Sequence, residues 1–396
     1  MKIFRKIHLW LSVPFGIIIA LVCFSGAMLI FEPEITRSVR HDVYYVADPN
    51  HEPLPMSTLL ETAQASLEDS VEITGVTVFS DPERTYQVNL SKPRRASLFI
   101  DQYSGKITGR YERLGFFSTM FGLHRWLLDS ANPHGDGPKV GKLVVGISVL
   151  VFVVALITGV VLWVPRARKT FKQSITISRS KLWKSLHVAG GMYVVIFVLA
   201  MALTGLTWSF PWYRSAFYAV CGVENTPRQI ASAASESKGG GREGREGREG
   251  REGRHGRGEG RSEGRSEGNG ERHHSPFGQW QSVYDQLHQR YPDAPQITVQ
   301  KEAASVTLST FGNPRAADQF SFDRRSGELT AGETYANAAP TDKVRGWIYA
   351  VHTGAFGGIV TRILWLLAAL LGASLPLTGY YIWIRRLYLK HHSAKA

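Results

Sequence analysis

Four histidines beside long apolar runs are the residues of this chain best suited to metal chemistry. His8 and His187 each stand at the start of such a run, and each is followed at the same offset by a hydroxyl residue and a glycine, Ser25-Gly26 and Thr204-Gly205. A neutral imidazole binds metal ions, haem iron included, through one ring nitrogen. The equal spacing predicts a repeated helix type.

Two further apolar runs share a second pattern. Each ends in Thr-Gly-x-x-x-Trp, beginning at Thr158 in one run and at Thr378 in the other, and each has a histidine upstream, His124 and His352. The sequence therefore predicts two alternating kinds of helix, each with its own histidine. For any single histidine at a membrane boundary, the alternative is an interfacial side chain that reaches water.

The four apolar runs are long enough to cross a membrane. At about 1.5 Å of rise per residue, a helix of about 20 residues covers a hydrocarbon core of about 30 Å. The first run is longer than a signal-peptide core and no small-residue cleavage site follows it, so we interpret it as a retained anchor. The predicted spans are residues 7–31, 140–164, 186–210 and 359–384.

Basic residues at the membrane edges account for much of the net charge of +13. Unbalanced lysines and arginines lie before the first span, between the second and third spans, and after the fourth. The positive-inside rule therefore places these segments and both termini in the cytoplasm. The long connections 32–139 and 211–358 then lie outside, and no nucleic-acid partner is expected.

The two outer connections repeat one order of predicted elements. Each has a helix followed by three strands and an Asp-x-x-Ser-Gly turn, in which the aspartate accepts local amide hydrogen bonds and the glycine takes a positive φ. The predicted helices cover 56–67 and 280–290. The predicted strands cover 71–79, 85–90, 96–100, 296–300, 305–310 and 318–322. We therefore predict two small α+β domains outside the membrane.

The segment 238–274 between the third span and the second outer domain consists mainly of Gly, Arg and Glu. With almost no apolar side chain, it cannot offset the entropy of ordering, so we predict a flexible linker. The regular alternation of arginine with glutamate disfavours an RNA-binding role.

Taken together, these motifs resemble the PepSY-associated transmembrane family, which includes haem-containing ferric-siderophore reductases of the bacterial inner membrane. The resemblance is carried by the opening segment 5–10, the segments around His124 and His187, residues 351–354, and the repeated Thr-Gly-x-x-x-Trp and Asp-x-x-Ser-Gly motifs. It covers nearly the whole chain except the linker. It implies a membrane all-α four-helix bundle with two periplasmic α+β PepSY-like domains.

The implied organisation alternates membrane and periplasmic segments. The predicted segments are span 1 at 1–31, PepSY-like domain 1 at 32–120, a pre-helix and span 2 at 121–164, a cytoplasmic loop at 165–185, span 3 at 186–210, a periplasmic connection at 211–237, the linker at 238–274, PepSY-like domain 2 at 275–345, a pre-helix and span 4 at 346–384, and a cytoplasmic tail at 385–396. The lipid bilayer is the partner that the spans themselves require.

The resemblance also implies two haem b groups, one for each pair of histidines. Topology places His8 and His187 near the cytoplasmic face as an inner pair, and His124 and His352 near the opposite face as an outer pair. His134 is a rival outer ligand, because the stretch that follows His124 is longer than its counterpart after His352. A non-haem metal centre is less favoured, since neither pair has carboxylates or thiols placed to complete its coordination.

The function that the resemblance implies is the release of iron. Single electrons from quinol or from a soluble cytoplasmic flavin reductase would pass from the inner to the outer haem and reduce a periplasmic ferric siderophore. The chain has no dinucleotide fingerprint and no phosphate-binding loop, so its electrons must come from another molecule. The outer arginines that could attract an anionic substrate are Arg94, Arg95, Arg113 and Arg125.

A haem-free membrane protein of PepSY type, which binds or regulates a peptide, protease or metal complex, is the alternative. Its histidines would be packing and interfacial residues. A transporter is a third alternative, which the lack of a broken helix or an acidic residue in the predicted spans disfavours. A visible spectrum of the purified protein separates the first two functions.

Overall fold

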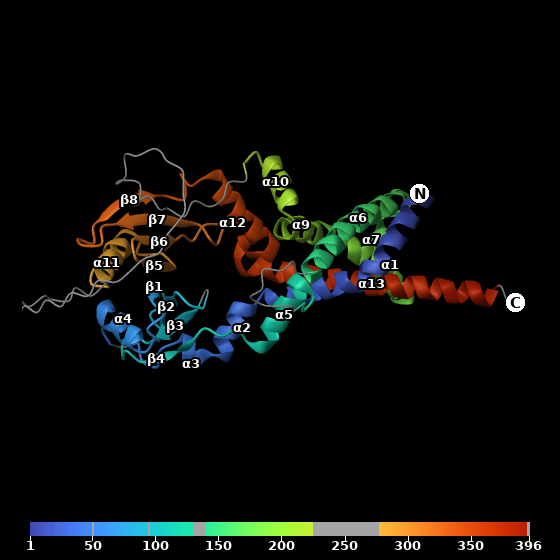
Figure 1. Ribbon diagram of the computed structural model, residues 1–396. Coiled ribbons are helices and arrows are strands. Elements are labelled where there is room, and N and C mark those ends of the chain that lie inside the picture. The colour runs from blue at the N-terminus through green and yellow to red at the C-terminus, as the bar shows by residue number, and fades with distance from the viewer. Residues whose placement is uncertain (50, 94–95, 130–139, 225–276, 394–396) are drawn as a thin grey trace, which may run out of the picture.

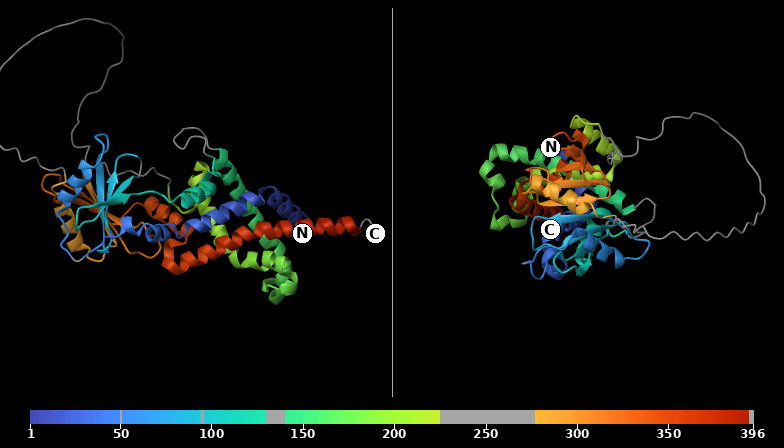
Figure 2. Two further views of the ribbon diagram at one scale, coloured as in Figure 1. Left: turned by 90° about the horizontal axis from the view of Figure 1, so that it is seen from below. Right: turned by 90° about the vertical axis from the view of Figure 1, so that its left-hand side faces the viewer.

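The computed structural model describes residues 1–49, 51–93, 96–129, 140–224 and 277–393. A helical bundle forms one end of the molecule, and a β-sheet lies at the other end (Figures 1 and 2). The first helix begins and the last helix ends at the bundle end, away from the sheet. The predicted linker 238–274 and His134 lie outside the described residues.

Four long apolar helices form the bundle and confirm the prediction of four spans. The first, second and fourth are α1 (Lys2–Leu29), α6 (Val140–Lys169) and α13 (Gly358–Ser393). The third consists of α8 (Leu182–Ser185), the π-helical turn η2 (Leu186–Gly190) and α9 (Gly191–Ser209). Both α1 and α9 pack against α6 and against α13, so α1 and α9 lie diagonally across the bundle.

The bundle has an apolar core and an apolar outer surface. Buried residues from all four helices, among them Ile19, Leu156, Val198 and Ala368, pack against one another in the core. Large apolar side chains such as Ile196, which is 76% exposed, cover the outside. Helices that are apolar all round are typical of a lipid environment, where the hydrogen bonds within each helix satisfy the backbone.

Short helices connect the bundle to the sheet. They are α2 (Glu32–Val39), α3 (His41–Tyr44), α5 (Gly115–Trp126), α10 (Pro211–Val220), α12 (Pro340–Thr353) and η3 (Ala355–Gly357). At the opposite end, α7 (Phe171–Ile175) and η1 (Arg179–Lys181) join the second and third spans. Helices α5 and α12 occupy equivalent places before α6 and α13, and they carry His124 and His352.

The sheet contains eight antiparallel strands in the order β4-β3-β2-β1-β5-β6-β7-β8. Its first half is β1 (Ile73–Phe79), β2 (Tyr86–Leu90), β3 (Ser97–Ile100) and β4 (Ile107–Arg110). Its second half is β5 (Gln296–Gln300), β6 (Ala303–Thr307), β7 (Ala317–Phe322) and β8 (Leu329–Glu333). Helices α4 (Met56–Ala65) and α11 (Trp280–Arg290) cover the face turned away from the bundle (Figure 1).

Each half of the sheet thus contains the predicted helix and three strands, together with a fourth strand. The fourth strand follows the Asp-x-x-Ser-Gly turn. In the first turn Asp101 accepts a bond from the amide of Tyr103, and in the second Asp323 accepts bonds from the amides of Arg325 and Ser326. The turn glycines have φ of 72° and 73°, as the motif predicts.

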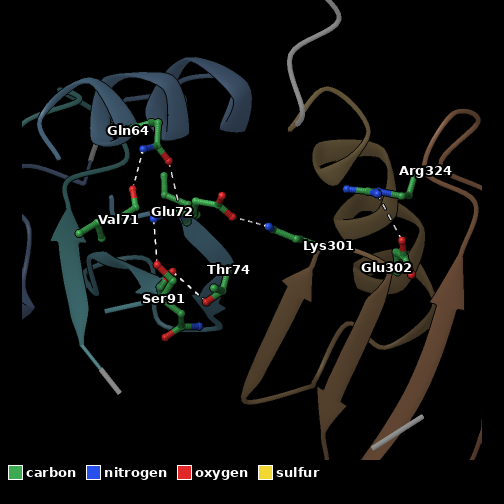
Figure 3. Close-up of polar contacts among 10 residues, drawn as sticks. Gln64, Val71, Glu72, Thr74, Ser91, Lys301, Glu302 and Arg324 are labelled. Atoms are coloured by element: carbon green, nitrogen blue, oxygen red, sulfur yellow. Dashed lines mark hydrogen bonds and ion pairs between the residues drawn. The ribbon is translucent and has the colours of Figure 1, made fainter. Parts of the chain in front are cut away.

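The two halves are joined into one sheet, which the sequence did not predict. Strands β1 and β5 pair in antiparallel register, with Val76 opposite Val299, and one apolar core extends across the junction. Beside the junction, Lys301 donates to Glu72 at 2.6 Å (Figure 3). The two predicted outer domains therefore form a single eight-stranded unit.

Candidate functional site

His8 and His187 are neighbours inside the bundle, at the end where α1 begins. His8 lies on α1 and His187 on the π-helical turn η2. Their ring centres are 6.2 Å apart, with an angle of 78° between the ring planes. Single π-helical turns often occur at functional sites. We call these two residues the inner pair.

His124 and His352 form a second pair of neighbours toward the sheet. They come from the equivalent helices α5 and α12, and their ring centres are 6.0 Å apart with an interplanar angle of 52°. The ring of Trp208 on α9 packs edge-on against His352 at 5.1 Å. We call His124 and His352 the outer pair. The structure therefore brings together the histidines that the sequence analysis paired.

The histidines of the first half are held by reciprocal contacts between helices. Nδ1 of His8 on α1 lies 3.0 Å from the carbonyl oxygen of Ala155 and 3.1 Å from Oγ1 of Thr158, both on α6. Nδ1 of His124, on the helix before α6, lies 2.9 Å from the carbonyl oxygen of Val22 on α1. Each helix type thus supplies the acceptor for the histidine of the other.

The second half repeats this exchange. Nδ1 of His187 lies 3.0 Å from the carbonyl oxygen of Leu375 and 3.1 Å from Oγ1 of Thr378 on α13. Nδ1 of His352, on the helix before α13, lies 3.0 Å from the carbonyl oxygen of Met201 on α9. The repeated hydroxyl-glycine motif therefore marks the turn that receives a histidine from another helix.

These contacts determine which ring nitrogen can act as a ligand. A carbonyl oxygen only accepts hydrogen bonds, so Nδ1 of each histidine must carry the proton and donate. In the neutral imidazole, Nε2 then keeps its lone pair, which is the arrangement of a metal-binding histidine oriented by a second hydrogen bond. Each pair consequently presents two ligand nitrogens of defined tautomer.

Four glycines allow the histidine rings to approach the helices. A Cβ placed on each of these glycines would lie close to Cε1 of the histidine received there. The distances are 2.8 Å for Gly26 against His124, 3.0 Å for Gly205 against His352, 3.3 Å for Gly379 against His187 and 3.5 Å for Gly159 against His8. The glycine of the motif is therefore needed most at the outer pair, where the contact is shortest.

The geometry of both pairs fits a metal held between two imidazoles. With metal–nitrogen bonds of about 2 Å on opposite sides, the two ring centres must be on the order of 6 Å apart. Both observed distances agree with this requirement. Within the described ranges, no group of three or more His, Cys, Asp or Glu side chains could hold a metal ion. The arrangement therefore suits a group that needs only two axial ligands, as haem does.

Two contacts of α13 were not predicted from the sequence. Arg362 on α13 donates to both carboxylate oxygens of Glu34, at 2.6 and 2.7 Å, and to the carbonyl of Ile30. In addition, a Cβ on Gly16 would lie 2.7 Å from the Tyr380 hydroxyl, so this glycine permits helix packing of α1 against α13. The one sequence signal for the contact between Arg362 and Glu34 was the presence of an arginine inside the predicted span 359–384.

The outer arginines differ in their surroundings. Arg113 donates to both carboxylate oxygens of Glu32, at 2.6 and 3.0 Å, so its charge is already paired. The Arg125 guanidinium lies 5.4 Å from the ring centre of Phe121. Arg94 and Arg95 lie outside the described residues.

The fold and the site define a four-helix membrane protein with an α+β region at one end, built on an eight-stranded sheet, and with two pairs of facing histidines. The chain belongs to the family described as the PepSY-associated TM region, whose family model matches residues 5–386. No curated protein matches the chain.

Proposed function

We propose that this protein is an inner-membrane di-haem b electron-transfer protein that reduces ferric siderophores in the periplasm and so releases ferrous iron. The observation that carries the proposal is the pairing of the histidines. Each pair has ring centres about 6 Å apart, and all four Nδ1 atoms face backbone carbonyls. His8 and His187 would hold one haem, and His124 and His352 the other.

The chain contributes ligands, orientation and a dry surrounding. Haem iron with two histidine ligands exchanges single electrons, with a potential set by its ligands and surroundings. The backbone carbonyls fix each imidazole in one tautomer and direction. The core residues Ile19, Phe152 and Val198, which lie along their helices between the two pairs, keep the interior apolar. Packed apolar side chains exclude water from a site and so lower its local dielectric, which affects the potential of a cofactor bound there.

Reduction of the substrate requires one electron for each ferric ion. Oxidation of one quinol releases two electrons and two protons, and one turnover of a flavin reductase likewise supplies two electrons, so either event would support reduction of two ferric complexes. Ferric iron prefers the hard oxygen ligands of a siderophore, and the ferrous product is held less tightly. The product is therefore released without any bond being broken in the siderophore.

The charge distribution supports entry of electrons from the cytoplasm. Residues 1–31, 165–185 and 385–396 contain no aspartate or glutamate, and lysines and arginines are frequent in all three. Segments of this kind remain on the cytoplasmic side. The inner pair lies toward this end of the bundle, and the outer pair lies toward the sheet.

A dithionite-reduced minus oxidised spectrum of the detergent-purified protein tests the cofactor, with haem quantified per chain. We expect low-spin b-type bands from two haems per chain. His8→Ala and His187→Ala should each remove one of them, and His124→Ala and His352→Ala should each remove the other. His288→Ala, which changes an exposed histidine on α11, should retain both.

The activity is tested in vesicles with a ferric siderophore outside, an electron donor inside, and a ferrous-specific chelator as the readout. Ferrous iron should appear with the unaltered protein and not with the His187→Ala variant. A stable but colourless protein after supply of haem would refute the proposal and favour the haem-free binding function.

A further inference from the structure

We propose that the hydroxyl groups behind the histidines tune the two sites to different potentials, the inner site being the more reducing. This inference rests on the proposed function. It concerns Thr158 and Thr378, which contact the inner pair, and it assigns the hydroxyl of the repeated motif a role beyond packing. The consequence is a preferred direction for electron transfer, from the inner to the outer pair.

At the inner pair, each Nδ1–H group has two acceptors. Nδ1 of His8 lies 3.0 Å from the Ala155 carbonyl oxygen and 3.1 Å from Thr158 Oγ1. Nδ1 of His187 lies at the same two distances from the Leu375 carbonyl oxygen and Thr378 Oγ1. Like the Thr378 hydroxyl, the Thr158 hydroxyl donates to two carbonyls of its own helix, at 2.9 Å from Val154 and 3.0 Å from Ala155. Since its hydrogen is used there, its lone pairs face the histidine. The hydroxyl therefore acts as an additional acceptor.

At the outer pair, the second acceptor is weaker or missing. His352 lies 3.3 Å from Thr204 Oγ1, which is longer than either inner contact. Within the part of the chain that the structure describes, Nδ1 of His124 contacts the Val22 carbonyl alone. The Ser25 hydroxyl lies on the same turn but donates to the carbonyls of Leu21 and Val22, at 2.6 and 3.2 Å. Unlike the threonine hydroxyls of the inner pair, it makes no contact with Nδ1 of His124 in the described structure.

Acceptors on Nδ1–H change the electronic character of the ligand. They draw the proton away from the ring and make Nε2 a stronger electron donor. A stronger donor stabilises ferric over ferrous iron, so the midpoint potential falls. The inner site, with two short additional acceptors, should therefore have the lower potential. Transfer of one electron would oxidise the inner site and reduce the outer site. This transfer is favourable because the outer site has the higher midpoint potential.

Charges near the two sites are the competing influence. Exposed lysines beside the inner pair, such as Lys6 and Lys184, favour the reduced state and act against the proposal. They face solvent, where salt screens charges beyond about 10 Å at 0.1 M. The hydroxyl contacts lie directly on the ligands and are not screened in this way. Potentials should therefore be compared at both low and high ionic strength.

The test is a spectroelectrochemical titration of the protein with haem bound. The His352→Ala background isolates the inner site, and the His187→Ala background isolates the outer site. We expect a lower midpoint potential for the inner site at high salt. Thr158→Val and Thr378→Val should each raise it, whereas Thr158→Ser, which keeps the hydroxyl, should restore the original value.

Two control variants test the outer site. Ser25→Ala should leave its potential unchanged, because among the described residues the Ser25 hydroxyl makes no contact with Nδ1 of His124. Thr207→Val, which changes a buried threonine bonded to the carbonyl of Thr204, should also have no effect. Haem content, measured in every variant, shows whether the fold is retained.

The outcomes distinguish this inference from the proposed function. Two haems with equal potentials at high salt, or a lower potential at the outer site, would overturn the inference and leave the proposed function standing. Unchanged potentials in both Thr→Val variants would also overturn it. A chain that takes up no haem would overturn both.

Discussion

The imidazole of His124 lies directly on Gly26: a Cβ built on this glycine would be 2.8 Å from Cε1 of the ring. Real Cβ contacts are not that short, and the ring is held by its bond to the Val22 carbonyl. Gly26→Ala should therefore move the ring and weaken that bond. We expect loss of most of the outer haem with the inner haem retained, measured as haem per chain in the reduced spectrum.

Gly159→Ala is the matched control for this prediction. Its Cβ would lie 3.5 Å from Cε1 of His8, an ordinary van der Waals distance, so both haems should be retained. The prediction would be wrong if the two variants lost haem equally. Such a result would mean that the glycine is needed for helix packing in lipid and not for the ring.

The sequence identified the histidines because a repeated pattern contains them. It placed His8 and Ser25 in one motif, yet about 25 Å of helix separates the two residues. The structure shows that His8 instead contacts Thr158 on α6, and that Ser25-Gly26 receives His124. Spacing along one chain gives the helix type, but the contact between helices depends on their packing.

The pairing of β1 with β5, which joins the two halves of the sheet, could also not be predicted from the sequence. Strand β5 alternates between buried and more exposed residues, and β1 is buried along most of its length. Neither pattern specifies the neighbouring strand. The fourth strands were missed for a different reason. Strand β4 has four residues, and β8 has one half-buried residue followed by four exposed ones, so neither has a clear apolar period.

The bond between Glu34 and Arg362 should make stability depend on pH. The hydrogen bonds from Arg362 hold the pKa of the Glu34 carboxyl below its usual value. The folded state therefore binds the proton less readily than the unfolded state, so the stabilisation is complete above the ordinary carboxyl pKa and is lost as the pH falls through the folded value. Thermal unfolding in detergent between about pH 3 and 7 should show this loss.

Glu34→Gln should remove that part of the pH dependence. Arg362→Gln should lower the free energy of unfolding more than Glu34→Gln does, by on the order of 1–2 kcal/mol, because the Ile30 carbonyl also loses its donor. The double variant should cost less than the sum of the two single variants. Additive losses would contradict a direct interaction between the two side chains.

The junction between the two halves of the sheet should depend on apolar packing more than on its ion pair. Val299 is fully buried opposite Val76, whereas Lys301 and Glu72 are both exposed. Val299→Ala should cost about 1.5–3 kcal/mol of unfolding free energy, and Lys301→Met less than about 1 kcal/mol. Denaturant unfolding measures both. A larger loss of unfolding free energy in Lys301→Met than in Val299→Ala would show that the ion pair stabilises the junction more than the apolar packing does.

The loop between β6 and β7 contacts the helix of His352 through Asn313 and Arg315 as well as Gly312. The amide of Gly312 donates to the Phe356 carbonyl at 2.9 Å, and its φ is 95°. A Cβ there would lie 2.2 Å from the ring of Trp347 on α12. Gly312→Ala combines backbone strain with a steric clash, so it should displace the loop or α12.

The comparison with Gly222→Ala separates these two effects. Gly222 also has a positive φ, 72°, but a Cβ there would have no neighbour within 4 Å. Both variants should lose about 1 kcal/mol from the backbone. Gly312→Ala should lose more and should also reduce the outer haem, because Trp347 and His352 share α12. Equal stability and full outer haem in both variants would show that α12 is positioned independently of the sheet.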